Sequence, residues 1–239
     1  VVGSRTALLF GNSIILVTYE YLPIMDQWLR EHGMPPITIL EYTDRNGERL
    51  TLEQECLRSG ALPALVYGNK SCSLKHKVGT QQKFCNNHPE CRKVWESGQR
   101  IVKFIGYDAG EEHRRTHAIV YDIQDKKYKN EYPLIDWGWF REDCIQAIQQ
   151  EGLPLPGKSS CFFCPSMKRS EIRTLYHNHR DLYERAIAIE RNAKPNLVSI
   201  KGLGRSWSWE DFVQADKNQT ALCGLFPEND MPCGCYDGE

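Results

Sequence analysis

The segment Cys161-Phe-Phe-Cys164 carries two thiols separated by two residues, behind a Lys-Ser-Ser sequence and before a proline. Such a pair can be half of a metal site, a redox-active dithiol, or two buried thiols without a chemical role. The chain has ten cysteines among its 239 residues. Because no secretory signature is seen, we expect these thiols to be reduced, and clustered reduced thiols favour metal or redox chemistry.

Not every cysteine is expected to take part in such chemistry. Cys56 and Cys144 lie in helix-like patterns, and we expect both to be small buried hydrophobic residues. A Cys56→Ser variant should therefore keep any bound metal. Cys72 lies in a separate segment, SCSLKHK, together with Lys75 and Lys77.

Charged residues are concentrated directly after the apolar segment RIVKFIGY (100–107). They are Asp108, Glu111, Glu112, Arg114 and Arg115. In open parallel sheets, ligands bind beyond the carboxyl ends of the strands, and the fork of an arginine binds phosphate or sulfate through two hydrogen bonds. A solvated loop is the alternative explanation for the same composition.

Two further segments could contribute to a ligand site at this edge. The opening VVGSRTALLF reads as a strand start, a turn and a helix-like run, and such a turn exposes backbone N–H groups to a phosphate. The turn comprises Gly3, Ser4 and Arg5, and Thr6 follows it. In YPLIDWGWF, Asp136 and Trp137 precede a helix, which Asp136 could instead cap.

The elements that would position these residues alternate between strand and helix in the first half of the chain. Apolar runs predict strands at 13–17, 36–40 and 100–107, and helical spacing predicts helices at 18–33 and 51–60. A proline in the first of these helices, Pro23, fits the first turn better than the middle. This alternation is typical of a parallel α/β sheet.

The periodicity becomes helical in the second half, at 141–152, 168–193 and 208–217. We therefore expect an α/β core at residues 1–135 and a helical C-terminal subdomain at residues 136–239.

Charge and hydropathy bear on the class of partner. The formal net charge of −1 indicates no whole-molecule attraction to nucleic acid or to a membrane surface, but it leaves local basic patches open. The apolar run SIILV is too short to span a bilayer or to form the core of a signal peptide. The sequence thus predicts a cytoplasmic protein without a membrane partner.

Four segments, in the right order, resemble the phosphoadenosine-phosphosulfate (PAPS) reductase family of the PP-loop ATP-pyrophosphatase superfamily, and the resemblance covers roughly the whole chain. IGYDAGEEHR is similar to the family's Gly-x-Arg-x-x-Glu-Ser-x-x-Arg segment, and YPLIDWGWFREDC to Pro-Leu-x-x-Trp-Thr-x-x-Asp-Val. SCSLKHK is similar to the Cys-x-x-x-Lys segment, and LPLPGKSSCFFC to the stretch leading into the family's Cys-x-x-Cys. The matching residues are Cys72, Lys75, Lys77, Gly106, Glu111, Arg114, Pro133, Leu134, Trp137 and Asp143. The family's phosphate loop, Ser-Gly-Gly-x-Asp-Ser, is not present as such, and VVGSRTALLF stands in its place.

The resemblance implies a PP-loop core, like that of the adenine nucleotide alpha hydrolases, that binds ATP or PAPS, with magnesium as a further cofactor. It implies that Lys75, Glu111 and Arg114 act at the reacting group, with Glu111 orienting phosphate oxygens or binding magnesium. The nucleotide-binding residues it implies are Gly3, Ser4, Arg5, Thr6, Gly106, Asp108, Arg115, Asp136 and Trp137.

In the iron–sulfur members of this family, cysteines near the position of Cys72 join a later Cys-x-x-Cys to hold a [4Fe–4S] cluster. The implied ligands are Cys72, Cys161 and Cys164. The expected fourth donor is Cys233 or Cys235 in the tail MPCGCYDGE, with Cys85 and Cys91 as weaker donors. Four thiolates suit tetrahedral zinc equally well, so zinc is the alternative.

The implied function is ATP-dependent, adenylating sulfur transfer or nucleobase modification, as in the DNA phosphorothioation members, with a nucleic acid or a sulfur-carrier protein as partner. Reduction of PAPS or adenylylsulfate is an alternative, although PCGCYDGE matches the family's Glu-Cys-Gly-Leu/Ile-His tail poorly. A third possibility is a metal-stapled nucleic-acid-binding module, since basic and aromatic residues alternate over residues 168–186. A solvated amphipathic helix explains the same stretch, because its acidic residues cancel the charge.

Overall fold

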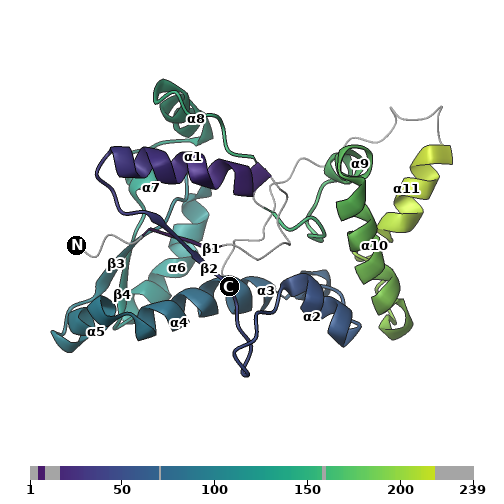
Figure 1. Ribbon diagram of the computed structural model, residues 1–239, viewed down its shortest axis with the longest axis horizontal. Helices are drawn as coiled ribbons and strands as arrows, with labels where there is room; N and C mark the ends of the chain where they lie inside the picture. The colour runs from purple at the N-terminus through teal and green to yellow at the C-terminus, as the bar shows by residue number, and fades with distance from the viewer. Residues whose placement is uncertain (1–4, 9–16, 70, 158–159, 219–239) are drawn as a thin grey trace.

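The computed structural model describes residues 5–8, 17–69, 71–157 and 160–218 (Figure 1). Its strands are β1 (Arg5–Leu8), β2 (Ile37–Leu40), β3 (Ile101–Phe104) and β4 (Tyr128–Glu131). Its helices and short helical turns are α1 (Val17–Glu31), α2 (Leu52–Ser59), η2 (Ala64–Tyr67), α3 (Ser71–Ser73), η3 (Leu74–Gly79), α4 (Thr80–Asn87), α5 (Pro89–Glu96), η4 (Ala109–Glu111), α6 (Glu112–Gln124), α7 (Pro133–Asp136), α8 (Arg141–Gln150), α9 (Arg169–Asn178), α10 (Arg180–Ala193), η5 (Lys194–Asn196) and α11 (Trp209–Asn218). The protein is mixed α/β and mostly helical.

The four described strands form two separate parallel pairs. β1 pairs with β2, with Arg5 opposite Ile37, and β3 pairs with β4, with Ile101 opposite Tyr128. Parallel strands need a crossover connection, and the segments that contain α1 and α6 supply it here. The predicted α/β class with parallel strands is confirmed at this level, with pairs of strands in place of one larger sheet among the described residues.

The start of the chain differs from the sequence-based prediction. Arg5 lies in β1, paired with β2, so it does not form the predicted turn, and Thr6 continues the strand in place of the predicted helix-like run. The predicted strand at 13–17 is wrong at Val17, which begins α1, and residues 13–16 lie outside the described residues. Short apolar runs fit a strand and a helix about equally well, and pairing with β2 decides the outcome for Arg5–Leu8.

Helix α1 begins at Val17, one residue before the predicted start. Pro23 lies inside the helix, whereas the sequence predicts it in the first turn, and it removes one backbone N–H donor from the helix interior. The helix is joined to β2 by Asp26, whose carboxylate accepts hydrogen bonds from the Ile37 N–H (2.5 Å) and from Arg30 Nε (2.7 Å). The predicted C-terminal stop at Gly33 is confirmed by its positive φ of 66°.

Helix α2 has the limits that its end signals predict. The Thr51 hydroxyl accepts from the Gln54 N–H (3.1 Å) while the Gln54 side chain accepts from the Thr51 N–H (3.0 Å), which forms a capping box. Gly60 ends the helix at a φ of 59°, and a Cβ there would lie 2.6 Å from Asn196 Nδ2. Arg185 of α10 donates to both carboxylate oxygens of Glu53, at 2.9 and 2.5 Å. These contacts hold α2 firmly against the C-terminal helices.

Strand β3 is a strand as predicted, but the prediction that it is buried is wrong. Val102 is 45% exposed and Phe104 is 73% exposed. The β3–β4 pair has no third strand among the described residues, so one side of each strand remains an edge.

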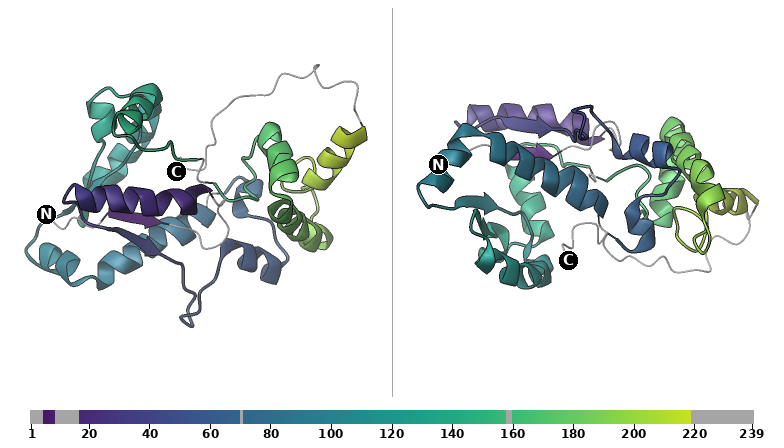
Figure 2. Two further views of the ribbon diagram at one scale, coloured as in Figure 1. Left: turned by 45° about the horizontal axis from the view of Figure 1, so that its top comes forward. Right: turned by 90° about the horizontal axis from the view of Figure 1, so that it is seen from below.

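The main hydrophobic core lies between α2, η2 and the helices α9, α10 and α11, rather than between the strands and their helices. Its fully buried members include Phe162, Phe163, Ile172, Ile187 and Trp209. Figures 1 and 2 show α9–α11 at one end of the molecule and the strands with α1, α6 and α8 at the other. The predicted domain boundary at residue 136 stays a prediction. Within the described part of the chain, no helix combines the length and apolar character needed to cross a membrane.

A buried carboxylate joins α10 to α11. Glu190 is 4% exposed and accepts hydrogen bonds from the backbone N–H groups of Leu203 (2.7 Å), Trp209 (3.0 Å) and Glu210 (3.2 Å). Burial raises the pKa of Glu190, and these three hydrogen bonds offset only part of that rise. The side chain thus caps the start of α11 and fixes it against α10.

Candidate functional site

Four cysteines from three separate segments lie near one another at the main hydrophobic core. Cys56 is on α2, Cys72 is on α3, and Cys161 and Cys164 lie between α8 and α9. Burial raises the pKa of Cys161 well above its usual value, and the neighbouring thiols of Cys164, Cys72 and Cys56 raise it further. The pKa of Cys56 is raised to about 12, first by burial and then by Glu55 and Cys72. The structure therefore brings the three predicted ligands together and adds a fourth thiol to them.

Two consecutive turns hold the Cys-x-x-Cys segment. The Cys164 N–H donates to the Cys161 carbonyl (3.0 Å), and the Met167 N–H donates to the Cys164 carbonyl (2.9 Å). Phe162 and Phe163 are both fully buried, with ring centroids 4.9 Å apart. These rings anchor the segment in the core, while the two cysteines stay partly exposed.

Two lysines stand near the thiols and differ in their roles. The charge of Lys77 lowers the pKa of Cys161 and of Cys72, against the larger effect of burial. The predicted catalytic residue, Lys75, donates through Nζ to Glu55 Oε1 at 2.5 Å. Burial by itself would lower the pKa of Lys75, but the hydrogen bond and charge of Glu55 outweigh it and the pKa is raised. Lys75 is therefore a cation held by a carboxylate, and Lys77 is the lysine whose charge acts on the thiols.

The structure adds Cys56 as a candidate for the fourth ligand. Cys56 is buried as predicted, at 4% exposed, but its thiol is a neighbour of Cys72 and Cys161. The expectation that Cys56→Ser keeps bound metal is therefore replaced by the opposite expectation. The two tail cysteines predicted as fourth donors, Cys233 and Cys235, lie outside the described residues.

The donor chemistry of this group fits an iron–sulfur cluster or zinc, both of which prefer thiolates. In the part of the chain that the structure describes, no three His, Cys, Asp or Glu side chains are already arranged so that they could hold a metal ion. The thiols thus lie near one another, and Cys56, Cys72 and Cys161 have raised pKa values, but they are not a formed ligand shell. Metal binding would have to remove their protons and draw the sulfurs closer, so metal affinity should increase with pH.

The predicted nucleotide segment at 106–115 meets the segment at 136–139. The Ala109 N–H donates to the Trp139 carbonyl (2.7 Å). Arg115 donates to Asp136 Oδ1 (2.8 Å) and to Glu112 Oε1 (2.9 Å), which joins the start of α6 to the end of α7. Asp136 therefore binds an arginine and does not cap α8, which was the alternative role for it. The segments 106–115 and 136–139, which the sequence predicts at the same edge of the sheet, are therefore adjacent in the structure.

Arg114 is buried beside the same loop, with 8% of its surface exposed. Its Nη1 donates to Glu111 Oε1 at 2.5 Å, and its guanidinium lies 4.1 Å from the centre of the Tyr107 ring. Since the two arginines of this loop both bind carboxylates, an incoming phosphate must displace a carboxylate or be joined to it by a cation such as magnesium.

The remaining predicted nucleotide-binding residues have mixed outcomes. Asp108 accepts a hydrogen bond from the Gly110 N–H (2.9 Å) and so shapes the loop. Trp137 is 62% exposed, and a Cβ on Gly106 would meet no atom within 4 Å. Gly3 and Ser4 lie outside the described residues, and the backbone of Arg5 and Thr6 lies in β1.

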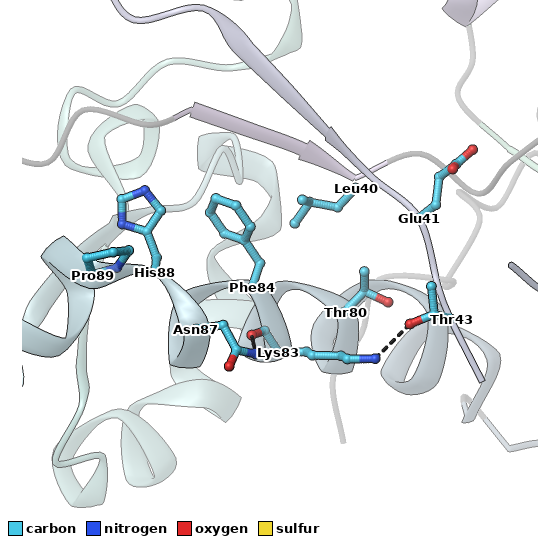
Figure 3. A pocket seen from close by; sticks show the side chains of 9 residues that line it. All are labelled: Leu40, Glu41, Thr43, Thr80, Lys83, Phe84, Asn87, His88 and Pro89. Carbon is cyan, nitrogen blue, oxygen red and sulfur yellow. Dashed lines mark hydrogen bonds between the residues drawn. The ribbon is translucent and has the colours of Figure 1, made fainter. Parts of the chain in front are cut away.

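A separate pocket of about 410 Å3 lies between the end of β2 and α4 (Figure 3). Its lining residues are Leu40, Glu41, Thr43, Thr80, Lys83, Phe84, Asn87, His88 and Pro89. The Lys83 ammonium donates to the Thr43 hydroxyl (2.6 Å) at one side of the pocket. None of its lining residues belongs to the predicted site.

The basic and aromatic stretch at 168–186 forms α9 and the first half of α10, and Arg173, Arg180 and Arg185 in it bind carboxylates. Arg173 donates to Asp216 (3.0 Å), and Arg180 lies 2.5 Å from Glu184 while stacking over the Tyr176 ring. This pairing of charges favours a solvated amphipathic surface over a nucleic-acid-binding face.

Comparisons with models of protein families, with curated proteins and with solved structures found no match to this chain.

Proposed function

We propose that this chain is an adenine-nucleotide-binding enzyme with a four-thiol metal centre, which uses ATP to activate an oxygen for sulfur transfer or nucleic-acid modification. The observation that carries the proposal is that Cys56, Cys72, Cys161 and Cys164, from three segments, lie near one another at the main core, where the charge of Lys77 lowers the pKa of Cys161 and Cys72. Thiolates are the ligands that iron–sulfur clusters and zinc prefer. The resemblance to the PAPS reductase family favours the cluster.

The chain's own contribution to the centre is to place the sulfurs. The capped helix α2 holds Cys56, the buried rings of Phe162 and Phe163 hold the Cys-x-x-Cys segment, and Lys77 favours the thiolate form. A [4Fe–4S] cluster bound there would supply one-electron chemistry, whereas zinc would act as a structural cross-link.

Nucleotide binding in this proposal is carried by the loop before α6. Arg115 has the more exposed of the two arginine side chains, at 32%, and would contact a phosphate first. Arg114 lies deeper, and its partner Glu111 would hold magnesium or orient the phosphate oxygens. In the reaction, the acceptor oxygen forms a bond to the α-phosphorus of ATP while the bond to pyrophosphate breaks, and the arginines stabilise the charge that develops.

Arg114→Ala should weaken nucleotide binding by about 1.5–3 kcal/mol, the range for loss of a charged hydrogen-bond partner, or roughly tenfold to 150-fold in Kd. Titration calorimetry with ATP and with PAPS would measure the effect and show which nucleotide binds more tightly. Arg114→Lys keeps the charge and should fall between the wild type and Arg114→Ala.

Arg191→Ala is the matched control, because Arg191 forms an exposed ion pair with Glu210 on the C-terminal helices. It should bind both nucleotides like the wild type. Folding of each variant is checked by circular dichroism. If folded Arg114→Ala binds ATP and PAPS as tightly as the control, the loop does not bind nucleotide.

A further inference from the structure

The pocket between the end of β2 and α4 holds a buried hydroxyl that none of the described residues uses. Thr80 is 8% exposed, and its Oγ1 has no hydrogen-bond partner within the described part of the chain. A buried hydroxyl without a partner is costly, so folded proteins rarely keep one that no ligand or water satisfies. Since Thr80 lines the pocket, its hydroxyl is available to a molecule that enters there.

Thr80 belongs to a group of three hydrogen-bond donors at one end of the pocket (Figure 3). Lys83 lies one turn further along α4, and its ammonium donates to the Thr43 hydroxyl (2.6 Å). The Thr43 O–H therefore remains to donate, and the ammonium keeps two further N–H groups. Within the described residues Lys83 pairs with no carboxylate, because Glu41 binds Arg49 Nε (2.7 Å) and points away from the pocket. This end of the pocket thus presents one positive charge and two hydroxyls.

The rest of the pocket is mainly apolar. Figure 3 shows the side chains of Leu40 and Phe84 between the donor end and His88. The His88 ring lies 5.3 Å from the Phe84 ring, and its buried Nδ1 has no hydrogen-bond partner among the described residues. Thr80 and His88 are eight residues apart, which places the two polar ends roughly 12 Å apart along α4. A matching ligand has an anionic head, an apolar body and a polar group at the far end.

We propose that this pocket binds a small aromatic carboxylic acid. The carboxylate accepts hydrogen bonds from the ammonium and the two hydroxyls at the donor end, and the aromatic ring packs between Leu40 and Phe84. A carboxylate fits better than a phosphate, because one ammonium and two neutral hydroxyls balance a single negative charge. The pocket volume of about 410 Å3 is near the lower end for small-molecule sites and suits a ligand with one ring.

The location agrees with this assignment. The pocket begins at Leu40, the last residue of the parallel strand β2, and ligands of parallel sheets bind beyond the carboxyl ends of the strands. It shares no residue with the four-thiol group or with the loop before α6, so the inference does not depend on the proposed function.

The test is an NMR titration of the full-length protein with 3-(4-hydroxyphenyl)propanoate and with its amide, which lacks the charge. We expect the carboxylate to bind saturably at one site per chain with a Kd of about 1 mM or lower, an affinity that a ligand of this size can reach. The amide should bind about tenfold more weakly, because it forms no charged hydrogen bond with Lys83. A wild type that shows no saturable binding, or that binds the amide as tightly, overturns the proposal.

Two variants locate the ligand. Lys83→Met removes the ammonium and should weaken binding of the carboxylate about tenfold. Thr80→Val removes only the hydroxyl and should weaken binding about threefold or more, yet melt no lower than the wild type because that hydroxyl has no partner. Lys93→Met is the matched control, since Lys93 pairs with Glu90 on α5 outside the pocket (2.8 Å).

Lys93→Met should bind the carboxylate like the wild type, and the fold of each variant is checked by circular dichroism. If either pocket variant binds as tightly as Lys93→Met, the ligand does not occupy this pocket. A lower melting temperature for Thr80→Val would show that the hydroxyl already has a partner, and would overturn the assignment as well.

Discussion

Cys56→Ser should lose most of its bound metal and melt about 5–10 °C below the wild type. The reason is that a thiolate site exists only in the folded chain, so the free energy of metal binding adds to the free energy of unfolding. Cys161→Ser should behave in the same way, because its thiol lies in the same group. The measurements are metal content after anaerobic purification and thermal melting by circular dichroism.

Cys91→Ser is the matched control, since Cys91 and Cys56 are equally buried at 4% exposed. A serine in either place puts a hydroxyl into an apolar site, so both variants lose some stability for that reason alone. Only the loss of metal separates them. If Cys56→Ser retains the metal content of Cys91→Ser, Cys56 is not a ligand.

Glu190→Ala should lower the free energy of unfolding by about 3 kcal/mol. The substitution removes the acceptor for the N–H groups of Leu203, Trp209 and Glu210, and buried N–H groups without a partner are costly. Glu190→Gln keeps one carbonyl oxygen and should cost less. Urea unfolding of the three proteins measures the differences.

Glu184→Ala serves as the control on the same helix, because the side chain of Glu184 is 48% exposed and forms a surface ion pair with Arg180. Its loss should change the free energy of unfolding by less than about 1 kcal/mol. A Glu190→Ala protein as stable as Glu184→Ala would show that α11 does not depend on this cap.

The sequence predicts best what is encoded locally. Helix α2 has its predicted limits because Thr51 and Gly60 are end signals that act within a few residues. The pairing of β1 with β2 joins residues far apart in the chain, so RTAL is read as the start of a helix when it is a strand. The burial of β3 is overestimated for a similar reason, because an apolar run does not show whether other strands will flank it.

The residues of the candidate site also separate into those that the local sequence predicts and those that depend on the fold. Cys161 and Cys164 are conspicuous by their spacing, and Cys72 by its place in SCSLKHK. Cys56 is missed because it lies on the buried face of α2 together with Leu52, where a cysteine reads as an ordinary core residue. The sequence feature that could have indicated the role of Cys56 is the short connection from Gly60 to α3, which keeps α2 close to Cys72. The ion pair between Glu111 and Arg114 is local and predictable from its spacing, whereas that between Arg115 and Asp136 needs the fold.

The most direct test of the four-thiol centre is elemental analysis of the wild-type protein purified without oxygen. Iron, acid-labile sulfide and zinc are measured per chain, together with the visible absorption spectrum. A cluster predicts about four iron and four sulfide per chain with broad visible absorption, and a zinc site predicts about one zinc and a colourless protein. Protein that is folded and reduced but contains neither metal, and takes up neither when supplied with iron and sulfide or with zinc, would contradict the account.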